Sequence, residues 1–193
     1  MKQFYRRSIM NNALKLLAIV GMPGAGKSVA ANFFRSQGIP VLRFGDQTDI
    51  GLKESGLALT EENERTYREQ LRLELGMAAM AIKIEPRILA ASKTSDMVVL
   101  DGLYSWEEYV YLKEKFPNIK LLCIWAPPSF RYERLAVRPV RPLALSQARE
   151  RDIAEIEHLN KAGPIAIADS CIVNDGDEAS FLNKLSAFYK TFA

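Results

Sequence analysis

Short, largely apolar runs recur along this chain, and amphipathic stretches separate them. The runs are Leu14–Val20, Ile39–Phe44, Met97–Asp101, Ile119–Ala126 and Ser170–Asn174. Runs of this kind are typical of parallel strands that are buried on both faces. Their alternation with helices predicts an α/β fold with one doubly wound, five-stranded parallel sheet and right-handed crossovers.

Helix signals lie between these runs. In Val29–Gln37 apolar residues recur four apart, and Thr60 precedes an acidic first turn, as an N-cap does. Ser105 and Glu108 have the spacing of a capping box, and Asp177 precedes an apolar stripe near the end of the chain. Each of these positions therefore predicts the start of a helix or its body.

Two stretches depart from the simple alternation of strand and helix. Residues 47–92 contain no strand pattern and are expected to form a helical excursion, polar over 47–60 and broken or restarted at Pro86. A helix from Ser146 to about Lys161 is expected to bury the side of Ile153, Ile156 and Leu159. The only histidine, His158, lies among polar residues of that helix and is interpreted as a surface residue.

Length and charge limit the class of protein. A chain of 193 residues suits a single domain with a full hydrophobic core. The 26 basic and 23 acidic residues give a net charge of +3, which predicts neither nucleic acid nor an anionic membrane as a partner. No apolar run reaches the roughly 18 residues of a membrane span. We expect a cytoplasmic protein, monomeric or homodimeric.

The cysteines and the first residues carry little chemistry. Cys123 and Cys171 both fall within expected strands, so we expect two buried free thiols rather than a disulfide or a zinc site. Residues 1–13 have no obvious place in the fold, which makes Met10 a candidate for the natural start.

The strongest motif follows the first apolar run. Gly21-Met22-Pro23-Gly24-Ala25-Gly26-Lys27-Ser28 matches the phosphate-binding pattern G-x-x-x-x-G-K-[ST] at every fixed position. Glycines let backbone N–H groups converge on phosphate oxygens, which a Cβ would obstruct. The motif predicts that Lys27 reaches the β- and γ-phosphates of ATP and that Ser28 binds Mg²⁺. Its position between a strand and a helix is the context that this motif requires.

Polar side chains follow two other strands. Asp46 comes just after the second strand, with Arg43 at its rim, and Asp101 ends the third strand. In parallel sheets ligands bind beyond the carboxyl ends of the strands, so these side chains should face the same crevice as the glycine loop. A strand often ends in an aspartate, but beside a complete glycine loop Mg²⁺ is held by the loop's hydroxyl and by a strand-end carboxylate such as Asp101, usually through water.

Three arginines lie along one face of the helix after Thr60. Glu61 and Glu64 stand four residues before Arg65 and Arg68, which favours solvated ion pairs for these two. Arg72 has no acid four residues before it and is the arginine expected to bind a ligand phosphate.

A second group of basic residues contains only arginine, because residues 121–160 contain no lysine. Its members are Arg131, Arg134, Arg138, Arg141, Arg149 and Arg151. The planar guanidinium favours bidentate contact with phosphate or carboxylate. Arg131 and Arg151 are interpreted as surface ion pairs, whereas Arg134 and Arg138 are expected to bind the nucleotide. Pro139 and Pro142 break the helix there, which predicts an irregular segment around Arg138 and Arg141.

Other classes of P-loop protein lack their signatures here. Asn160-Lys161-Ala162-Gly163 and Asn183-Lys184-Leu185-Ser186 both lack the aspartate of a guanine-reading N-K-x-D motif. Leu145-Ser146-Gln147 is not the L-S-G-G-Q motif of an ABC-type ATPase, and the chain is short for a motor module. A small-molecule kinase needs a lobe for the acceptor and a cationic lid that excludes water. The helical excursion with Arg72 fits the lobe, and the proline-broken arginine segment fits the lid.

Together these residues resemble the adenylate kinase-like branch of P-loop kinases, closest to small adenylate kinase-related and dephospho-CoA kinase-like proteins. The resemblance rests on Gly21–Ser28, Phe44-Gly45-Asp46, Leu100-Asp101-Gly102, Arg134-x-x-x-Arg138 and 168–176. It implies a three-layer P-loop fold with strand order 2-3-1-4-5. It also implies a core at 14–46, 93–130 and 164–193, an acceptor lobe at about 47–92 and a lid at about 131–163.

The same resemblance implies roles for individual residues. Arg134 would flank the adenine of ATP, Arg138 would contact its phosphates, and Arg141 and Arg149 would belong to the lid. Arg72 matches an arginine of the acceptor lobe. In place of the arginine that often follows Asp101-Gly102 in such proteins stands Leu103-Tyr104.

The acceptor stays open between three interpretations. A nucleoside monophosphate would need no general base, because its phosphate oxygen is already a nucleophile. A hydroxyl acceptor, as in dephospho-CoA, would need Asp46 as the base. A nucleotide-binding switch or regulatory ATPase would have no small acceptor. The catalytic candidates are Lys27, Asp46 and Arg138, and the acceptor-binding candidates are Arg43, Asp46, Arg72 and Asp101.

Overall fold

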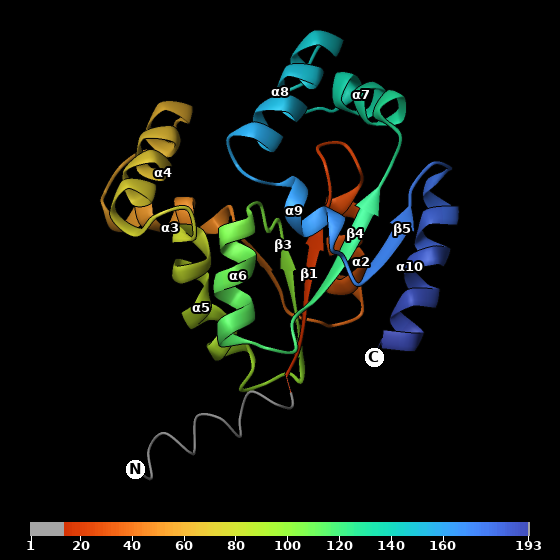
Figure 1. The fold of residues 1–193 in the computed structure, drawn as a ribbon, viewed down its shortest axis with the longest axis horizontal. Helices are drawn as coiled ribbons and strands as arrows, with labels where there is room; N and C mark the ends of the chain where they lie inside the picture. Colours follow the sequence, from red (N-terminus) through yellow and green to blue (C-terminus); the bar gives the residue numbers. More distant parts are fainter. Residues whose placement is uncertain (1–13, 193) are drawn as a thin grey trace.

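The computed structural model describes residues 14–192, whose strands form one parallel sheet in the order β2-β3-β1-β4-β5 (Figure 1). The strands are β1 (Lys15–Val20), β2 (Val41–Arg43), β3 (Met97–Asp101), β4 (Lys120–Trp125) and β5 (Ser170–Val173). Both the predicted fold and the predicted strand order are confirmed. The glycine loop follows the central strand β1, and residues 1–13, including the candidate start at Met10, lie outside the described residues.

Nine helices of the described chain surround this sheet or extend from its edge. They are α2 (Lys27–Ser36), α3 (Asp46–Glu54), α4 (Glu61–Leu75), α5 (Ala79–Ala91), α6 (Trp106–Lys115), α7 (Pro128–Val137), α8 (Leu145–Glu157), α9 (Ala162–Ala166) and α10 (Glu178–Phe192). The expected caps are present, because Thr60 accepts from the Asn63 N–H at 3.2 Å and Asp177 accepts from the Ser180 N–H at 2.7 Å. Ser105 forms the full capping box at the start of α6.

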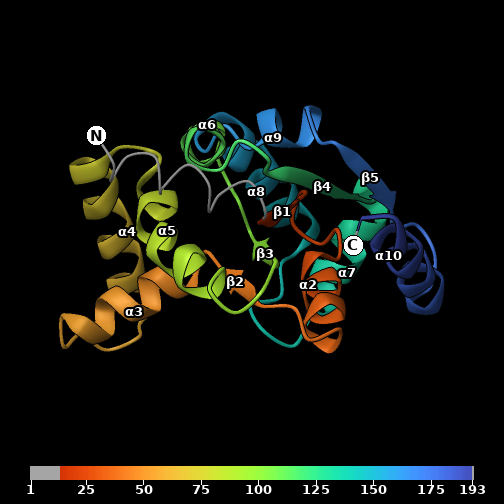
Figure 2. The ribbon, with the colours of Figure 1, turned by 90° about the horizontal axis from the view of Figure 1, so that it is seen from below.

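The core consists of two apolar layers, one on each face of the sheet. Leu16 and Ala18 of β1 pack on the side of α5 and α6, whereas Leu17 and Ile19 pack on the side of α2 and α10. Figure 2 shows α6 and α9 on one side of the strands and α2 on the other. Each buried leucine or isoleucine contributes roughly 1.5–3 kcal/mol relative to an exposed one. This double burial holds β1, and hence the loop after it, in a fixed position.

The helical excursion differs from expectation in two places. α3 begins at Asp46, one residue before the stretch 47–60 described as polar, and runs into it, and Asp46 and Asp49 in its first turn interact favourably with the helix dipole. α5 continues through Pro86 instead of breaking there. Proline removes one backbone hydrogen bond, but the fully buried Ile84 and Ile88 on either side hold both halves of α5 in the core.

The face that α8 buries is polar, contrary to prediction. Ile153 and Ile156 are 47% and 46% exposed, whereas Asp152 and Glu155 are each only 7% exposed. The helix is also shorter than expected, since it ends at Glu157. Buried carboxylates need cationic partners, so α8 is placed by ion pairs and not by an apolar stripe.

The two groups of helices outside the core lie on the side to which the strands point (Figure 1). α3 and α4 form one group and α7 and α8 the other, and the glycine loop lies beneath α7 and α8. Cys123 is buried as expected, but Cys171 is exposed because β5 is an edge strand. Among residues 14–192, no helix has the length and hydrophobicity that crossing a bilayer requires.

Candidate active site

The glycine loop adopts a conformation that side chains would prevent. Gly24 and Gly26 have φ angles of 78° and 106°, in the left-handed region. A Cβ on Gly24 would lie 2.5 Å from the Arg131 carbonyl oxygen, and one on Gly26 would lie 2.4 Å from Asn174 Nδ2. Both glycines are therefore required twice, by the backbone angle and by the neighbours against which the loop rests.

Two side chains from distant segments fix the loop. Asn174, just after β5, donates through Nδ2 to the Ala25 carbonyl at 2.8 Å. Arg131 of α7 donates through Nη1 to the Pro23 carbonyl at 3.0 Å. The interpretation of Arg131 as a surface ion pair was wrong, because its side chain is 6% exposed and lies against the loop. Its partner, Asp152 of α8, accepts from Nη1 and Nη2 at 2.9 and 2.6 Å.

Lys27 opens α2 and lies over the loop that precedes it. Its Nζ donates to the carbonyls of Gly21 and Met22 at 2.9 and 3.0 Å. Burial and the nearby charge of Lys161 lower the pKa of Lys27 to about 7. Burial and the neighbouring positive charge destabilise the ammonium form of Lys27, and a phosphate bound beside it would stabilise that form. Binding phosphate is the role predicted for Lys27.

Asp101 ends β3 at the level of the glycine loop. It is in register with Ile19 of β1 and with Arg43 of β2. Burial raises the pKa of Asp101, and the charge of Lys27 opposes this effect. Ser28, at the start of α2, carries the hydroxyl that is expected to be the second Mg²⁺ ligand. Hard oxygen donors of this kind fit Mg²⁺, and residues 14–192 hold no cluster of three His, Cys, Asp or Glu that would bind a metal without phosphate or water.

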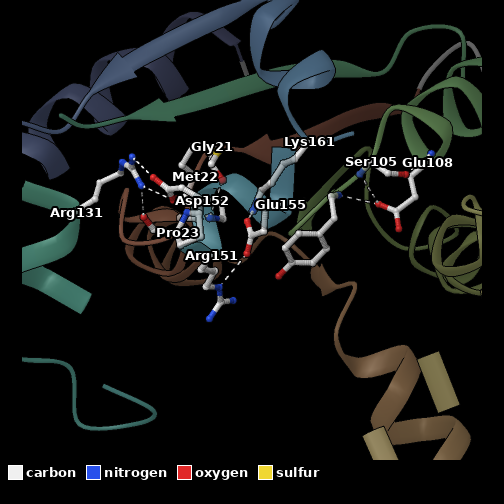
Figure 3. Close-up of polar contacts among 12 residues, drawn as sticks. Gly21, Met22, Pro23, Ser105, Glu108, Arg131, Arg151, Asp152, Glu155 and Lys161 are labelled. Atoms are coloured by element: carbon white, nitrogen blue, oxygen red, sulfur yellow. Dashed lines mark hydrogen bonds and ion pairs between the residues drawn. The ribbon is translucent and has the colours of Figure 1, made fainter. Parts of the chain in front are cut away.

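A buried lysine lies beside these groups and was not among the predicted site residues. Lys161, between α8 and α9, is 2% exposed and forms an ion pair with Glu155 of α8. Its Nζ lies 4.8 Å from the centre of the Tyr104 ring. The charges of Lys161 and Glu155 both act on Lys27, so the pair lies near the glycine loop, and Figure 3 shows it in the same part of the site. Lysine in a polar loop is ordinarily exposed, so no pattern in the sequence predicts that this one is buried.

On the other side of Asp101, arginines surround Asp46. Arg87 of α5 lies 3.3 Å from Asp46 Oδ2, and Arg43 lies 3.9 Å from Asp46 Oδ1. The charges of Asp46 and Arg43 both act on Asp101, so the three groups lie together at the edge of the sheet. Arg87 was missed because Asp46 is 41 residues away from it.

The three arginines of α4 each have a different acidic neighbour. Arg65 pairs with Glu69 at 2.8 Å and not with Glu61, whereas Arg68 pairs with Glu64 at 3.3 Å as expected. Arg72 is half-buried, and its charge acts on Glu108 at the start of α6. Burial raises the pKa of Glu108 to about 7, although backbone N–H groups and Arg72 oppose the rise.

The arginines of the expected lid have unfilled hydrogen-bonding capacity. Within residues 14–192, three buried side-chain polar atoms lack a hydrogen-bond partner, and two of them are Arg134 Nη1 and Arg138 Nη2. Arg134 donates through Nη2 to the Asn174 carbonyl at 3.1 Å, and its guanidinium lies 5.9 Å from the Phe130 ring centre. Buried guanidinium nitrogens without acceptors fit the contacts that a nucleotide would supply.

The segment between α7 and α8 reaches across to α4. Arg141, which has a φ of 52°, lies 3.7 Å from Glu64 Oε2. Arg138 donates through Nε to the Arg141 carbonyl at 2.6 Å. Arg149 is exposed on α8, and Arg151 pairs with Glu155 at 3.0 Å as predicted for an ion-paired residue. The two helical groups therefore meet through Arg141 and Glu64.

Known proteins show both sequence and structural similarity to this chain. A family model described as an AAA domain matches residues 17–178. The UPF0200 protein of Pyrococcus abyssi is 35% identical over 170 residues, which cover 86% of this chain and 90% of that protein.

Two solved structures share the fold. The Thermus thermophilus protein TT1252 superimposes with a TM-score of 0.67 at 20% identity, over 94% of this chain and 100% of that one. Shikimate kinase of Bacteroides thetaiotaomicron superimposes with a TM-score of 0.58 at 15% identity, over 91% of this chain and 98% of that one.

Proposed function

This chain belongs to the P-loop family described as an AAA domain and to the UPF0200 family, and we propose that it is an ATP-dependent kinase of a small, phosphate-bearing acceptor. The acceptor that we propose is a nucleoside monophosphate. The chain would act in the cytoplasm as a monomer or homodimer, with ATP as co-substrate.

One observation carries this proposal: two arginines bracket Asp46 at the sheet edge that also holds Asp101 and the glycine loop. Arg87 and Arg43 lie within 3.3 and 3.9 Å of the Asp46 carboxylate, so these three side chains carry one net positive charge, while Lys27 opposes the charge of Asp101. Guanidinium groups bind phosphate in a bidentate manner. A phosphate on the acceptor therefore suits this side of the site, with Arg72 of α4 as a further candidate contact.

The reaction balances without a general base. An oxygen of the acceptor phosphate attacks the γ-phosphorus of ATP, the bond from that phosphorus to the β–γ bridging oxygen breaks, and ADP leaves. Lys27 would neutralise charge that develops on the β- and γ-phosphates, and Arg138 would do so from the lid. Ser28 and, through water, Asp101 would hold Mg²⁺, which when bound would neutralise negative charge on the phosphate oxygens.

The lid and the acceptor lobe have complementary tasks. Arg134 and Arg138 of the lid have guanidinium nitrogens available to the nucleotide. The Arg141–Glu64 contact would draw the lid, including Arg149, towards the α3–α5 lobe and exclude water from the transfer. Without such closure, water would compete as the acceptor and the protein would hydrolyse ATP.

An acceptor screen tests the proposal. ADP release would be measured with ATP and Mg²⁺ against AMP, CMP, UMP, their deoxy forms and dephospho-CoA, and each product identified by mass. We expect a monophosphate to raise the rate above background hydrolysis. Stimulation by dephospho-CoA alone would support a hydroxyl acceptor, and no stimulation by any acceptor would support a regulatory ATPase.

Asp46→Asn separates the two kinase interpretations. With a phosphate acceptor, the loss should fall mainly on KM for the acceptor, because Asp46 then positions the arginines and the acceptor. With a hydroxyl acceptor, the loss should fall mainly on kcat, because Asp46 then removes the proton. Glu69→Gln is a matched control, since it neutralises an exposed carboxylate paired with Arg65.

A further inference from the structure

Lys161 is a buried cation that the transfer described above does not use. Its side chain is 2% exposed, and its ammonium pairs with Glu155 and faces the Tyr104 ring at 4.8 Å. The backbone N–H of Lys161 also donates to the Glu155 carbonyl at 3.3 Å. Burying an ammonium is costly unless partners compensate, so the position of Lys161 calls for a reason.

α8 brings this ion pair to the glycine loop. Asp152 is joined to the loop through Arg131, whose Nη1 donates to both the Asp152 carboxylate and the Pro23 carbonyl. Glu155 follows three residues later on the same face of the helix, which corresponds to about 5 Å along its axis. Lys161 lies close enough to the loop for its charge to act on Lys27, and Figure 3 shows Glu155 between Arg151 and Lys161.

The charges around Glu155 do not balance. Its carboxylate pairs with Lys161 and also with Arg151, which lies 3.0 Å away. Asp152 is neutralised by its own bidentate partner Arg131. One carboxylate therefore pairs with two cations, and Lys27 of the nearby loop has Asp101 as its opposing charge, which leaves one excess positive charge. An ion pair with only a structural task would need no excess cation, whereas a bound anion would supply the missing charge.

We infer that Lys161 is a second phosphate-binding lysine, which turns from Glu155 towards the terminal phosphate of a bound nucleoside triphosphate. This inference rests on the proposed function, because it assumes that the glycine loop holds the other phosphates. Glu155, itself paired with Arg151, keeps the ammonium in place until the triphosphate arrives. Lys161 distinguishes ATP from ADP, since only ATP presents the terminal phosphate.

Binding measurements test this assignment without any catalysis. Affinities for the β,γ-imido analogue of ATP and for ADP, each with Mg²⁺, would be measured by calorimetry. Lys161→Met should weaken binding of the ATP analogue by about tenfold or more relative to ADP, as the loss of a charge-assisted hydrogen bond predicts. Lys120→Met is the matched control, because Lys120 also pairs with a carboxylate, Asp169 at 2.7 Å, and is not part of the site.

Glu155→Gln provides a second, independent variant, which also decides the matter should Lys161→Met fail to fold. Removing the carboxylate frees the ammonium and removes a negative charge near the terminal phosphate. The preference for the ATP analogue over ADP should then rise about threefold or more.

The assignment of Lys161 would be overturned by an unchanged preference for the ATP analogue over ADP in Glu155→Gln, or by an equal loss of affinity for both nucleotides in folded Lys161→Met. Neither result would overturn the proposed function. Failure of the wild-type protein to bind either nucleotide would overturn the proposed function and the assignment with it.

Discussion

Replacing Asp152 by asparagine should destabilise the protein far more than its place on a charged helix suggests. Its Oδ1 accepts from Arg131 Nη1 at 2.9 Å, and its Oδ2 accepts from Arg131 Nη2 at 2.6 Å and from the Tyr132 hydroxyl at 2.9 Å. The side chains of Arg131 and Asp152 are only 6% and 10% exposed. Asparagine keeps the shape and one acceptor oxygen but removes the charge.

The magnitude follows from what remains after the substitution. Arg131 stays charged and buried, and its other acceptors among residues 14–192 are the carbonyls of Ala126 and Pro23, at 3.2 and 3.0 Å in the wild-type protein. Breaking a buried ion pair by removing one partner costs about 3–5 kcal/mol, because an uncompensated charge is left behind. Asparagine retains one hydrogen bond, so we expect a loss of about 3 kcal/mol in the free energy of unfolding.

Urea unfolding monitored by circular dichroism measures this loss. A change of about 3 kcal/mol should lower the midpoint by about 1 M or more, since urea m-values are about 1–3 kcal/mol per M. Glu69→Gln, which neutralises the exposed pair with Arg65, should change stability by less than about 1 kcal/mol. The double variant Arg131→Met with Asp152→Leu should recover most of the loss, because it leaves no buried charge. A loss for Asp152→Asn as small as that of Glu69→Gln would refute this account of the pair.

Three further changes test other parts of the structure. Burial raises the pKa of Glu108 from 4.5 to about 7, so the folded state binds this proton more tightly than the unfolded state. The stability of the wild-type protein should therefore fall by about 3 kcal/mol relative to Glu108→Gln as pH rises from about 4.5 to 8. Denaturation at several pH values would show it, and a constant difference between the two proteins would contradict it. Gly51→Ala should lower stability by about 1–3 kcal/mol in thermal unfolding, because its Cβ would lie 2.0 Å from the Tyr67 hydroxyl, and the loss should vanish in a Tyr67→Ala background. Lys27→Ala should lower phosphoryl transfer by about a hundredfold or more with an unchanged circular dichroism spectrum, since it removes charge stabilisation and no core contact.

Local features of the fold were predictable because local sequence determines them. Apolar runs identified the five strands, and Ser105 with Glu108 identified the start of α6. The glycine loop was equally visible, since its fixed residues lie within eight positions. The strand order came from resemblance, because apolar runs alone do not say which strands are neighbours.

Features that depend on distant partners were not predictable in the same way. Arg131 and Asp152 stand 21 residues apart, and only their pairing permits the burial of both. The pattern of apolar residues on α8 therefore pointed to the wrong face, with Ile153 exposed and Asp152 buried. Lys161 was missed for the same reason, because Glu155 and the Tyr104 ring make its burial possible. The burial of a charge is a property of its tertiary partners.

For the site residues, position was predictable from the sequence, but the acceptor they serve was not. Asp46 and Asp101 do lie at one sheet edge with Lys27 nearby, as the positions of strand ends predict. Which acceptor they serve depends on groups such as Arg87, which the chain brings to Asp46 from a separate helix. Their assignment as acceptor-binding residues stays a prediction.

Transfer of the γ-phosphoryl group to a small acceptor is the central claim, and isotope labelling follows that group directly. The protein would be incubated with Mg²⁺, each candidate acceptor and ATP carrying ¹⁸O in the terminal phosphate, and the products resolved by mass spectrometry. We expect the label in a nucleoside diphosphate formed from the added monophosphate. Label found only in inorganic phosphate, whatever acceptor is present, would contradict it.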